Sequence, residues 1–272
     1  MITFPYAKIN LGLHIHSKRA DGFHTIETVF YPIHSFSDVL EIIPTDKSNY
    51  SFQQSGIFIE NQNDSNLVEK AYLLLKKPYN LPSVDMFLYK RIPVGAGLGG
   101  GSSDAAFALK LLNTLFKLNL SDEKLKEYAS QLGSDCPFFI DNTPAIGTGR
   151  GNELLPCLIP QLTGKYIVIV TPDVFISTAQ AYKLCQPIKR TVFLSDIISQ
   201  PIQTWKELLI NDFERILFPI YPQLQKIKEN LYQHGAIYAS LSGSGSSLYG
   251  IFNKKPEMLE FDGNCFCSEL ST

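Results

Sequence analysis

The sequence of 272 residues lacks several features that would assign it to a specialised class of protein. It has no run of about 18 apolar residues, so no membrane span is expected. The N-terminus has no continuous apolar segment, so no signal peptide is expected either. A net charge of −2 leaves no basic excess, which argues against a general nucleic-acid or membrane-surface binder.

Cysteine is scarce, and its spacing excludes the common cysteine-based sites. There are five cysteines, an odd number, and no C-x-x-C pair occurs. Only Cys265 and Cys267 are close together, and no histidine cluster accompanies them. A zinc site built on cysteine is therefore not expected. Reduced thiols are the simpler interpretation, so we expect a cytoplasmic protein. From the net charge and the lack of a long apolar run, we expect no nucleic-acid or membrane partner.

The remaining composition is that of an ordinary globular protein. Hydrophobic residues make up 44% of the chain and charged residues 18%, which is enough apolar material for a substantial core. The length predicts one or two domains. A linker is expected near residues 155–160, which predicts domains over residues 1–155 and 156–272. Strand-like and helix-like segments are mixed without a repeated β-α-β pattern, which favours an α+β fold.

Hydrophobic periodicity predicts most of the helices and strands. Apolar and polar residues alternate from Ala7 to His16, which predicts a strand with one apolar and one polar face. Lys8 and Asn10 share the polar face, about 7 Å apart along the strand. Further strands are expected over residues 25–33, 38–43, 50–52, 84–90, 166–170, 237–241 and 247–252. Helices are expected over residues 66–77, 103–116, 122–131, 177–184, 195–199, 205–217 and 224–234, with Ser102 and Ser121 as caps of the second and third.

The strongest functional motif is a glycine-rich run between the strand at 84–90 and the helix at 103–116. It consists of Pro93, Val94, Gly95, Ala96, Gly97, Leu98, Gly99, Gly100, Gly101, Ser102 and Ser103. Its glycines allow close backbone approach to a ligand, and the unpaired N–H groups at a helix start favour an anion. The alternative is an ordinary turn before a capped helix, but so many glycines cost more folding entropy than such a turn requires. The run predicts a polyphosphate cradle, with serine hydroxyls able to meet Mg²⁺.

Two other kinds of phosphate loop fit this run less well. The pattern G-x-x-x-x-G-K-[ST] is absent, which excludes a Walker A loop. A G-x-G-x-x-G pattern does start at Gly95, but the strand before it is not the first and contains Asp85 and Lys90. The acidic residues at the expected distance, Asp122 and Glu123, open a helix rather than end a strand. A nicotinamide-dependent dehydrogenase is therefore a minor alternative.

The motifs taken together resemble the GHMP kinase family, whose ATP loop has the pattern P-x-x-x-G-L-G-[SG]-[SG]-S. Residues 93–103 fit this pattern, and residues 241–247 are similar to the family's later glycine motif. The resemblance is strongest to members that phosphorylate the 2-hydroxyl of a cytidine-diphosphate-linked methylerythritol in non-mevalonate isoprenoid precursor synthesis. It is carried by A-K-I-N-L-G-L at 7–13, R-A-D-G-F-H at 19–24, G-G-S-S-D-A-A at 100–106, G-S-D-C-P-F-F at 133–139 and G-T-G-R-G at 147–151.

This resemblance implies a fold and an activity. The expected fold is the two-domain α+β GHMP kinase fold, with a ribosomal-S5-domain-2-like N-terminal half, a ferredoxin-like C-terminal half and the site in the cleft between them. The expected activity is transfer of a phosphoryl group from ATP, with Mg²⁺, to a small-molecule alcohol. A GHMP kinase of the homoserine or mevalonate type, or a non-catalytic nucleotide-binding module, are the alternatives that the loop leaves open.

The resemblance also implies the catalytic pair. Asp135 is expected to accept the proton of the hydroxyl or to position that hydroxyl, with Lys8 beside it. A lysine near a carboxylate keeps the carboxylate ionised and can stabilise a phosphoryl oxygen. Outside these motifs, Asp135 would be interpreted as a turn residue before Pro137, and Lys8 as part of a solvated strand face.

Contacts to the substrate are expected from the same strand and from two aromatic residues. Asn10 shares the face of Lys8 and is expected to reach the same ligand. Phe23 is expected to stack on the cytosine, where the family more often has tyrosine, and His24 to hydrogen-bond the base edge.

Further contacts are expected from three more segments. Thr178 is expected to contact the substrate and Tyr182 to supply a second stacking face, although a helix N-cap at Ser177 also explains that segment. Asn66 and Lys90 resemble positions that line the adenine site, with a helix N-cap and a strand-edge charge as the alternatives. The histidines His14, His16 and His34 are predicted to be non-catalytic.

Overall fold

The computed structural model describes residues 1–57, 66–257 and 261–270, and the chain packs into two compact units. Unit 1 comprises Met1–Ala7, Phe36–Val94 and Gly99–Thr143, and unit 2 comprises Lys8–Ser35, Gly95–Leu98 and Pro144–Thr272. The chain passes between the units several times, whereas the predicted domains, 1–155 and 156–272, are contiguous. That boundary stays a prediction.

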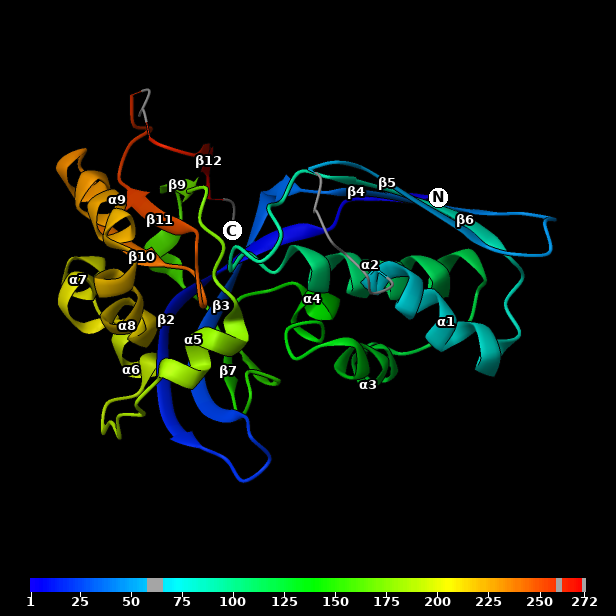
Figure 1. Cartoon of the computed structure of the whole chain (residues 1–272), viewed down its shortest axis with the longest axis horizontal. Helices are drawn as coiled ribbons and strands as arrows, with labels where there is room; N and C mark the ends of the chain where they lie inside the picture. The colour runs from blue at the N-terminus through cyan, green and yellow to red at the C-terminus, as the bar shows by residue number, and fades with distance from the viewer. Residues whose placement is uncertain (58–65, 258–260, 271–272) are drawn as a thin grey trace. The chain divides into compact units, whose positions relative to one another are not determined.

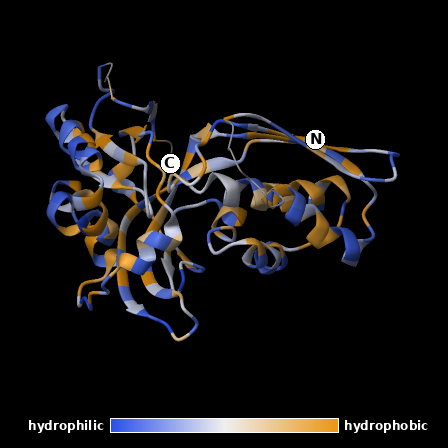
Figure 2. Cartoon of the chain, viewed as in Figure 1, coloured by the Kyte–Doolittle hydropathy of each residue, from blue (hydrophilic) through white to orange (hydrophobic). Residues whose placement is uncertain are grey.

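Unit 1 combines one sheet with four helices (Figure 1). The sheet has the strand order β1-β4-β6-β5, with β5 parallel to β6 and the other pairs antiparallel. Its elements are β1 (Ile2–Thr3), β4 (Val39–Pro44), β5 (Ser51–Gly56), β6 (Val84–Lys90), α1 (Leu67–Tyr79), α2 (Gly100–Leu115), α3 (Asp122–Leu132) and α4 (Phe138–Asp141). Helix α2 packs against the other three helices and against β1 and β4. Figure 2 shows hydrophobic residues along α2, which therefore forms the centre of this core.

Unit 2 contains two four-stranded sheets. The first sheet has the strand order β2-β3-β7-β8 and consists of β2 (Tyr6–Lys18), β3 (His24–Ser37), β7 (Ala145–Thr148) and β8 (Glu153–Pro156). The first two residues of β2 and the last two of β3 belong to unit 1. The second is an antiparallel sheet of β9 (Tyr166–Thr171), β10 (Tyr238–Leu241), β11 (Leu248–Phe252) and β12 (Asn264–Glu269) in the order β10-β11-β9-β12.

The helices of unit 2 cover part of these sheets. They are α5 (Thr178–Leu184), α6 (Leu194–Ile198), α7 (Trp205–Leu208), α8 (Asp212–Ile220) and α9 (Pro222–Gln233), with short 3-10 turns at Pro160–Leu162 and Ile202–Thr204. Helix α9 packs on β10 and β11, α7 packs on β10, and α5 packs on α8. Among the described residues, no helix has both the length and the apolar character that crossing a membrane requires.

The predicted α+β class is confirmed, and several elements match their predicted bounds closely. Strand β6 spans the predicted residues, and α3 begins after Ser121, whose side chain accepts a hydrogen bond from the backbone of Lys124. The alternation from Ala7 to His16 lies in β2, as predicted. The polar face of β2 is not solvated, however, because Lys8, Asn10 and His14 are all buried.

Two predicted helix boundaries were wrong, the end of α1 and the start of α2. Helix α1 continues through Pro78, since a proline in the last turn removes only one helical hydrogen bond and the left-handed Asn80 ends the helix. Helix α2 begins at Gly100 and not at Ser103, so Ser102 lies inside the first turn and does not cap it. Left-handed Gly99, with φ of 72°, stands at the N-cap.

The helix predicted over residues 205–217 is in fact two helices, α7 and α8. The backbone between them pairs with β2, where the amide of Leu13 donates to the carbonyl of Ile210 at 3.0 Å. Asn211 then caps α8 by accepting a hydrogen bond from the backbone of Phe213. The strands β7, β8 and β12 were not predicted; the hairpin of β7 and β8 contains the glycines of the G-T-G-R-G motif.

Candidate functional site

The two glycine-rich motifs contact each other within unit 2. Gly97, with φ of 79°, lies so close to the second motif that a Cβ atom there would be 2.0 Å from the carbonyl oxygen of Ser242. The hydroxyl of Ser242 donates to the carbonyl of Gly97 at 2.8 Å, and the amide of Ser247 donates to the carbonyl of Ala96 at 3.1 Å. Position 97 therefore requires glycine for both its φ angle and its close backbone approach.

Lys8 lies directly beside this part of the loop. Its ammonium donates to the side-chain oxygen of Asn10 at 2.6 Å and to the carbonyl of Gly97 at 2.9 Å. Its backbone amide donates to the carbonyl of Leu98 at 2.9 Å. The amide nitrogen of Asn10 in turn donates to Thr28 on β3. The structure thus brings the predicted residues Lys8 and Asn10 together with residues 97 and 98 of the glycine-rich run.

Asn211 holds the second glycine motif in place, and sequence reasoning missed it. The side chain is fully buried, and its amide donates to the carbonyls of Leu241 and Gly243 at 2.8 and 2.9 Å. A signal for the helix start was present, since Asn211 is followed three residues later by Glu214. That spacing is typical of an N-cap.

In unit 1, residues 100–103 of the run form the first turn of α2. Gly100 has no room for a side chain, because a Cβ atom there would lie 2.9 Å from Ile92 and 3.2 Å from the ammonium of Lys90. Ser103 is fully buried, and its hydroxyl has no hydrogen-bond partner among residues 1–57, 66–257 and 261–270. The first N–H groups of a helix have no partner within the helix, so this 16-residue helix presents donors suited to an anion.

The turn that carries Asp135 lies next to this helix start. A Cβ atom on Gly133 would be 3.2 Å from the sulfur of Cys136 and 3.9 Å from the hydroxyl of Ser102. Burial raises the pKa of the Cys136 thiol to about 12, against a smaller opposite effect of its hydrogen bond with Ser102. The structure therefore brings the Asp135 turn and Ser102 of the glycine-rich run together within unit 1.

Lys90 is held in a buried cluster of charges. Its ammonium pairs with the carboxylates of Asp38 and Asp104, and all three side chains are at most 2% exposed. Burial raises the pKa of Asp104 to about 7, and Asp38 adds to this, although Lys90 opposes it. Burial alone would lower the pKa of Lys90, but the two carboxylates more than offset this and raise it. The second oxygen of Asp38 accepts from the backbone of Arg91 and Ile92. The cluster thus ties the end of β6 to β4 and α2.

Asn66 occupies the N-cap of α1. Its side-chain oxygen accepts from the amide of Val68 at 2.9 Å, its side-chain amide donates to Gln54, and Glu69 completes a capping box. The helix-cap interpretation thus accounts for the side chain of Asn66, as the ion cluster does for Lys90. Their predicted contacts with adenine stay predictions.

The residues predicted to recognise a base lie near one another in unit 2. The rings of His24 and Tyr182 stack at a centroid distance of 5.0 Å and an angle of 23°. Burial lowers the pKa of His24, and Lys18 adds to this effect. Phe23 is exposed, and the guanidinium of Arg150 lies 4.6 Å from its ring centre.

Thr178 begins α5, and its hydroxyl lies 2.9 Å from that of Ser244 in the second glycine motif. The preceding residue, Ser177, caps the helix as the alternative interpretation expected. Thr178, which is predicted to contact the substrate, thus hydrogen-bonds to Ser244 in the glycine motif that packs against Gly97.

Comparisons with known proteins find matches to one family in both halves of the chain. The profile described as the GHMP kinases N terminal domain matches residues 66–149, and the GHMP kinases C terminal profile matches residues 193–260. Together they cover more than half of the chain. The chain is 51% identical to the 4-diphosphocytidyl-2-C-methyl-D-erythritol kinase of Bacteroides fragilis strain YCH46 over 275 residues, which is 99% of this chain and 100% of that protein.

Two solved structures have a fold similar to that of this chain. A crystal structure of 4-(cytidine 5'-diphospho)-2C-methyl-D-erythritol kinase has a TM-score of 0.78 and 30% identity, over 92% of this chain and 90% of that one. The homoserine kinase from Cytophaga hutchinsonii has a TM-score of 0.68 at 15% identity, over 91% of this chain and 85% of that one. The second likeness supports the fold alone.

Proposed function

Because the chain belongs to the GHMP kinase family, we propose that it transfers the γ-phosphoryl group of ATP to the 2-hydroxyl of 4-diphosphocytidyl-2-C-methyl-D-erythritol. The product would feed non-mevalonate isoprenoid precursor synthesis. The observation that carries the proposal is the 51% identity over 99% of the chain to a kinase of that name. A cytoplasmic location, expected from the cysteine usage, is part of the same proposal.

ATP is proposed to bind at the glycine-rich run, residues 93–103. Support comes from the close backbone approach at Gly97 and from the unpaired donors at the start of α2, which favour polyphosphate. Asn66 and Lys90 are proposed to line the adenine site. Because their side chains already have protein partners, such contacts would come through backbone or methylene groups.

The proposed chemical step uses Asp135 and Lys8. The 2-hydroxyl oxygen attacks the γ-phosphorus, its proton passes to the carboxylate of Asp135, and the bond from the γ-phosphorus to the bridging oxygen breaks to release ADP. The ammonium of Lys8 stabilises negative charge on the transferred group. Support for the role of Lys8 comes from its two hydrogen bonds, to Asn10 and to the carbonyl of Gly97, which orient the ammonium beside the loop.

Mg²⁺ fits the donors at the start of α2. Hydroxyl and carboxylate oxygens are the ligands this ion prefers, and the buried hydroxyl of Ser103 has no protein partner in the described part of the chain. Ser102 and Ser103 are therefore proposed to hold it. When bound, the ion neutralises charge on the ATP phosphates.

Recognition of the cytosine is proposed to involve Phe23, His24 and Tyr182, with Asn10 and Thr178 contacting the rest of the substrate. His24 already covers one face of Tyr182, so a base would stack on the other face or displace the histidine. Burial lowers the pKa of His24, so its neutral ring can both donate and accept a hydrogen bond at the base edge.

An ADP-release assay tests the proposal. The purified chain is given ATP, Mg²⁺ and, in separate reactions, the cytidine-diphosphate-linked methylerythritol, mevalonate or homoserine. We expect turnover with the first alcohol only. Turnover with mevalonate or homoserine in its place would overturn the substrate assignment, and ATP binding without turnover on any alcohol would overturn the enzymatic one.

The role of Asp135 is tested by the variant Asp135→Asn, which keeps the size of the side chain. We expect kcat to fall by roughly 10²–10⁴-fold, because general base catalysis is lost, while ATP binding is retained. The fluorescence of a bound ATP analogue measures the second quantity. Near-normal turnover would remove Asp135 from the mechanism without affecting the substrate assignment.

A further inference from the structure

Three side chains with metal-ligand chemistry that are not among the proposed catalytic or substrate-binding residues meet on β2 and β3. His14 and His16 are two positions apart on β2 and therefore project from the same face, and Glu27 comes from the neighbouring strand β3. One ligand atom from each lies within 4.8 Å of the other two. His14 and His16 were predicted to be non-catalytic, and that prediction gives no reason for their ligand atoms to lie so close to the carboxylate of Glu27.

Two of the three side chains, His14 and Glu27, are buried, and three of their polar atoms have no hydrogen-bond partner among the described residues. His14 is 1% exposed and Glu27 is 4% exposed. Both ring nitrogens of His14 and one carboxylate oxygen of Glu27, Oε2, have no hydrogen-bond partner anywhere in the described ranges. Burying an unsatisfied polar group costs about 1–3 kcal/mol, so a cluster with three such atoms calls for a ligand.

A direct ion pair between histidine and glutamate does not account for the cluster. The Nδ1 atom of His14 is 3.9 Å from Oε2 of Glu27, and Nε2 of His16 is 3.5 Å from the same oxygen. Both separations are longer than a normal hydrogen bond.

The distances suit an ion placed between the three atoms. Zinc binds imidazole nitrogen and carboxylate oxygen at about 2.0–2.2 Å, and its tetrahedral geometry separates two ligand atoms by about 3.3–3.5 Å. The separations of 3.5 and 3.9 Å come close to this range. The remaining pair of ligand atoms, on His14 and His16, also lies within 4.8 Å.

The surroundings orient the carboxylate and balance the nearby positive charge. The other oxygen of Glu27, Oε1, accepts a hydrogen bond from the backbone of Leu194 at 2.8 Å. Such a contact fixes the direction of a metal-binding carboxylate. The nearby guanidinium of Arg190 is paired through both of its terminal nitrogens with Asp212, so its charge is compensated.

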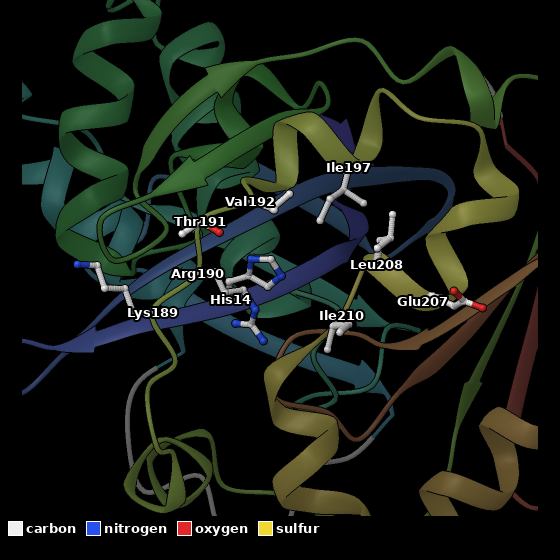
Figure 3. A pocket seen from close by; sticks show the side chains of 9 residues that line it. All are labelled: His14, Lys189, Arg190, Thr191, Val192, Ile197, Glu207, Leu208 and Ile210. Carbon is white, nitrogen blue, oxygen red and sulfur yellow. The ribbon is translucent and has the colours of Figure 1, made fainter.

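A cavity of about 360 Å³ gives access to His14 (Figure 3). In Figure 3 the imidazole lies in the middle of the lining, near the guanidinium of Arg190, with Lys189 and Glu207 at opposite sides. Several apolar side chains complete the wall, namely Val192, Ile197, Leu208 and Ile210. Of the three proposed ligands, His14 lines this cavity, so a hydrated ion would approach the site from the side of His14.

We propose that His14, His16 and Glu27 form a binding site for one transition-metal ion of the Zn²⁺ type, with a water from the cavity as fourth ligand. The ion would link β2 to β3 and, through Glu27, to the backbone at Leu194. Its role is structural, since no residue of the proposed phosphoryl transfer belongs to the set. The proposal does not depend on the substrate assignment.

Metal titration of the full chain tests this site. The exposed thiols of Cys265 and Cys267 could bind Zn²⁺ independently, so both are first replaced by serine. The chelator-treated protein is titrated with Co²⁺, whose visible absorption reports tetrahedral coordination, and the Co²⁺ is then displaced by Zn²⁺. We expect one ion per chain and a rise in Tm with Zn²⁺, because binding to the folded state alone stabilises it.

Variants of the ligands complete the test. We expect His16→Ala and Glu27→Gln each to weaken Co²⁺ binding by more than the roughly 10–100-fold typical of outer-sphere changes. His16 is partly exposed, so its removal is the substitution least disruptive to folding. His234→Gln, on the exposed end of α9, is the matched control and should bind Co²⁺ normally. The proposal is overturned if no tetrahedral spectrum forms, or if both ligand variants bind as tightly as the control.

Discussion

Lys8 in unit 2 and Lys90 in unit 1 are both almost fully buried, with 3% and 2% of their surface exposed. The ammonium of Lys90 pairs with the carboxylates of Asp38 and Asp104. The ammonium of Lys8 donates to an amide oxygen and a backbone carbonyl, and it lies 5.5 Å from the ring centre of Phe30. Neutral oxygens orient a cation without cancelling its charge, whereas carboxylates cancel it. The contacts of Lys8 suit a group that acts on phosphate, and those of Lys90 suit a group that stabilises the fold.

The largest expected effect is on the Lys90 cluster. Lys90→Met leaves two buried carboxylates without their cation, and we expect the free energy of unfolding to fall by about 3–5 kcal/mol. Urea denaturation measures it. The control is Lys47→Met, which removes the exposed partner of Asp85 in the same unit and should change stability by about 0–1 kcal/mol. Loss of ATP affinity in Lys90→Met with unchanged stability would instead support a direct contact with the nucleotide.

The next effect is on turnover and concerns Lys8. Lys8→Met keeps the length and the apolar stem of the side chain but removes its charge. We expect kcat to fall by roughly 10²–10³-fold, as when one donor to a transition-state oxygen is lost. The free energy of unfolding should fall by about 1.5–3 kcal/mol, because the hydrogen bonds from the charged ammonium to Asn10 and to Gly97 are lost. If Lys8→Met unfolds readily but retains its turnover, Lys8 stabilises the fold and does not act on phosphate.

A smaller effect is the pH dependence that Asp104 imparts. Its pKa is raised from 3.8 to about 7 in the folded state, so between these values the folded state keeps a proton that the unfolded state has lost. The contribution of Asp104 to the stability of the fold is therefore complete below pH 3.8, the ordinary pKa, and is lost as the pH rises through about 7.

His14 has the opposite dependence, because its pKa is lowered from 6.5 to about 4. The useful measurement is therefore the difference in unfolding free energy between the wild-type chain and Asp104→Asn, whose amide does not titrate. We expect this difference to decrease as the pH rises from 3.8 to about 7, between the ordinary pKa of Asp104 and its pKa in the folded state. A difference that does not vary with pH would show that Asp104 is ionised throughout.

The smallest effect concerns the contact between the glycine motifs. Ser242→Ala removes the hydrogen bond to the carbonyl of Gly97, which still accepts from Lys8. We expect a loss of about 1 kcal/mol in stability, with kcat little changed. Ser268→Ala, which loses the exposed hydrogen bond to Ser35, is the control. A large loss of kcat in Ser242→Ala would mean that this hydrogen bond also orients Lys8.

The glycine at position 97 and the shared face of Lys8 and Asn10 could be predicted from the sequence because their signals are local. Gly97 is one example, since close approach and a positive φ both require glycine at that position. The alternation along β2 is another, because it places Lys8 and Asn10 on one face whatever that face contacts. The family resemblance extended these local patterns to an activity, which the full-length identity to a named kinase supports.

Other features could not be predicted, because they depend on residues far apart in the chain. Nothing near Lys90 indicates that Asp38, 52 residues earlier, will pair with it. Asn211 is a helix cap by its local spacing, but its hold on the turn at Gly243 depends on a contact across 32 residues. The break between α7 and α8 likewise follows from the pairing of that segment with β2.

The sequence by itself determined where the backbone turns, which faces of strands are polar and which residues could cradle a phosphate, because periodicity and glycine conformation act over a few neighbouring residues. Only the tertiary structure decided which buried charges are cancelled. Lys8, Lys90 and His14 are all polar residues within or at the end of strands, and the sequence does not distinguish their environments. Burial makes the difference, because removing water leaves each charge or ring nitrogen dependent on the partners that the fold brings to it.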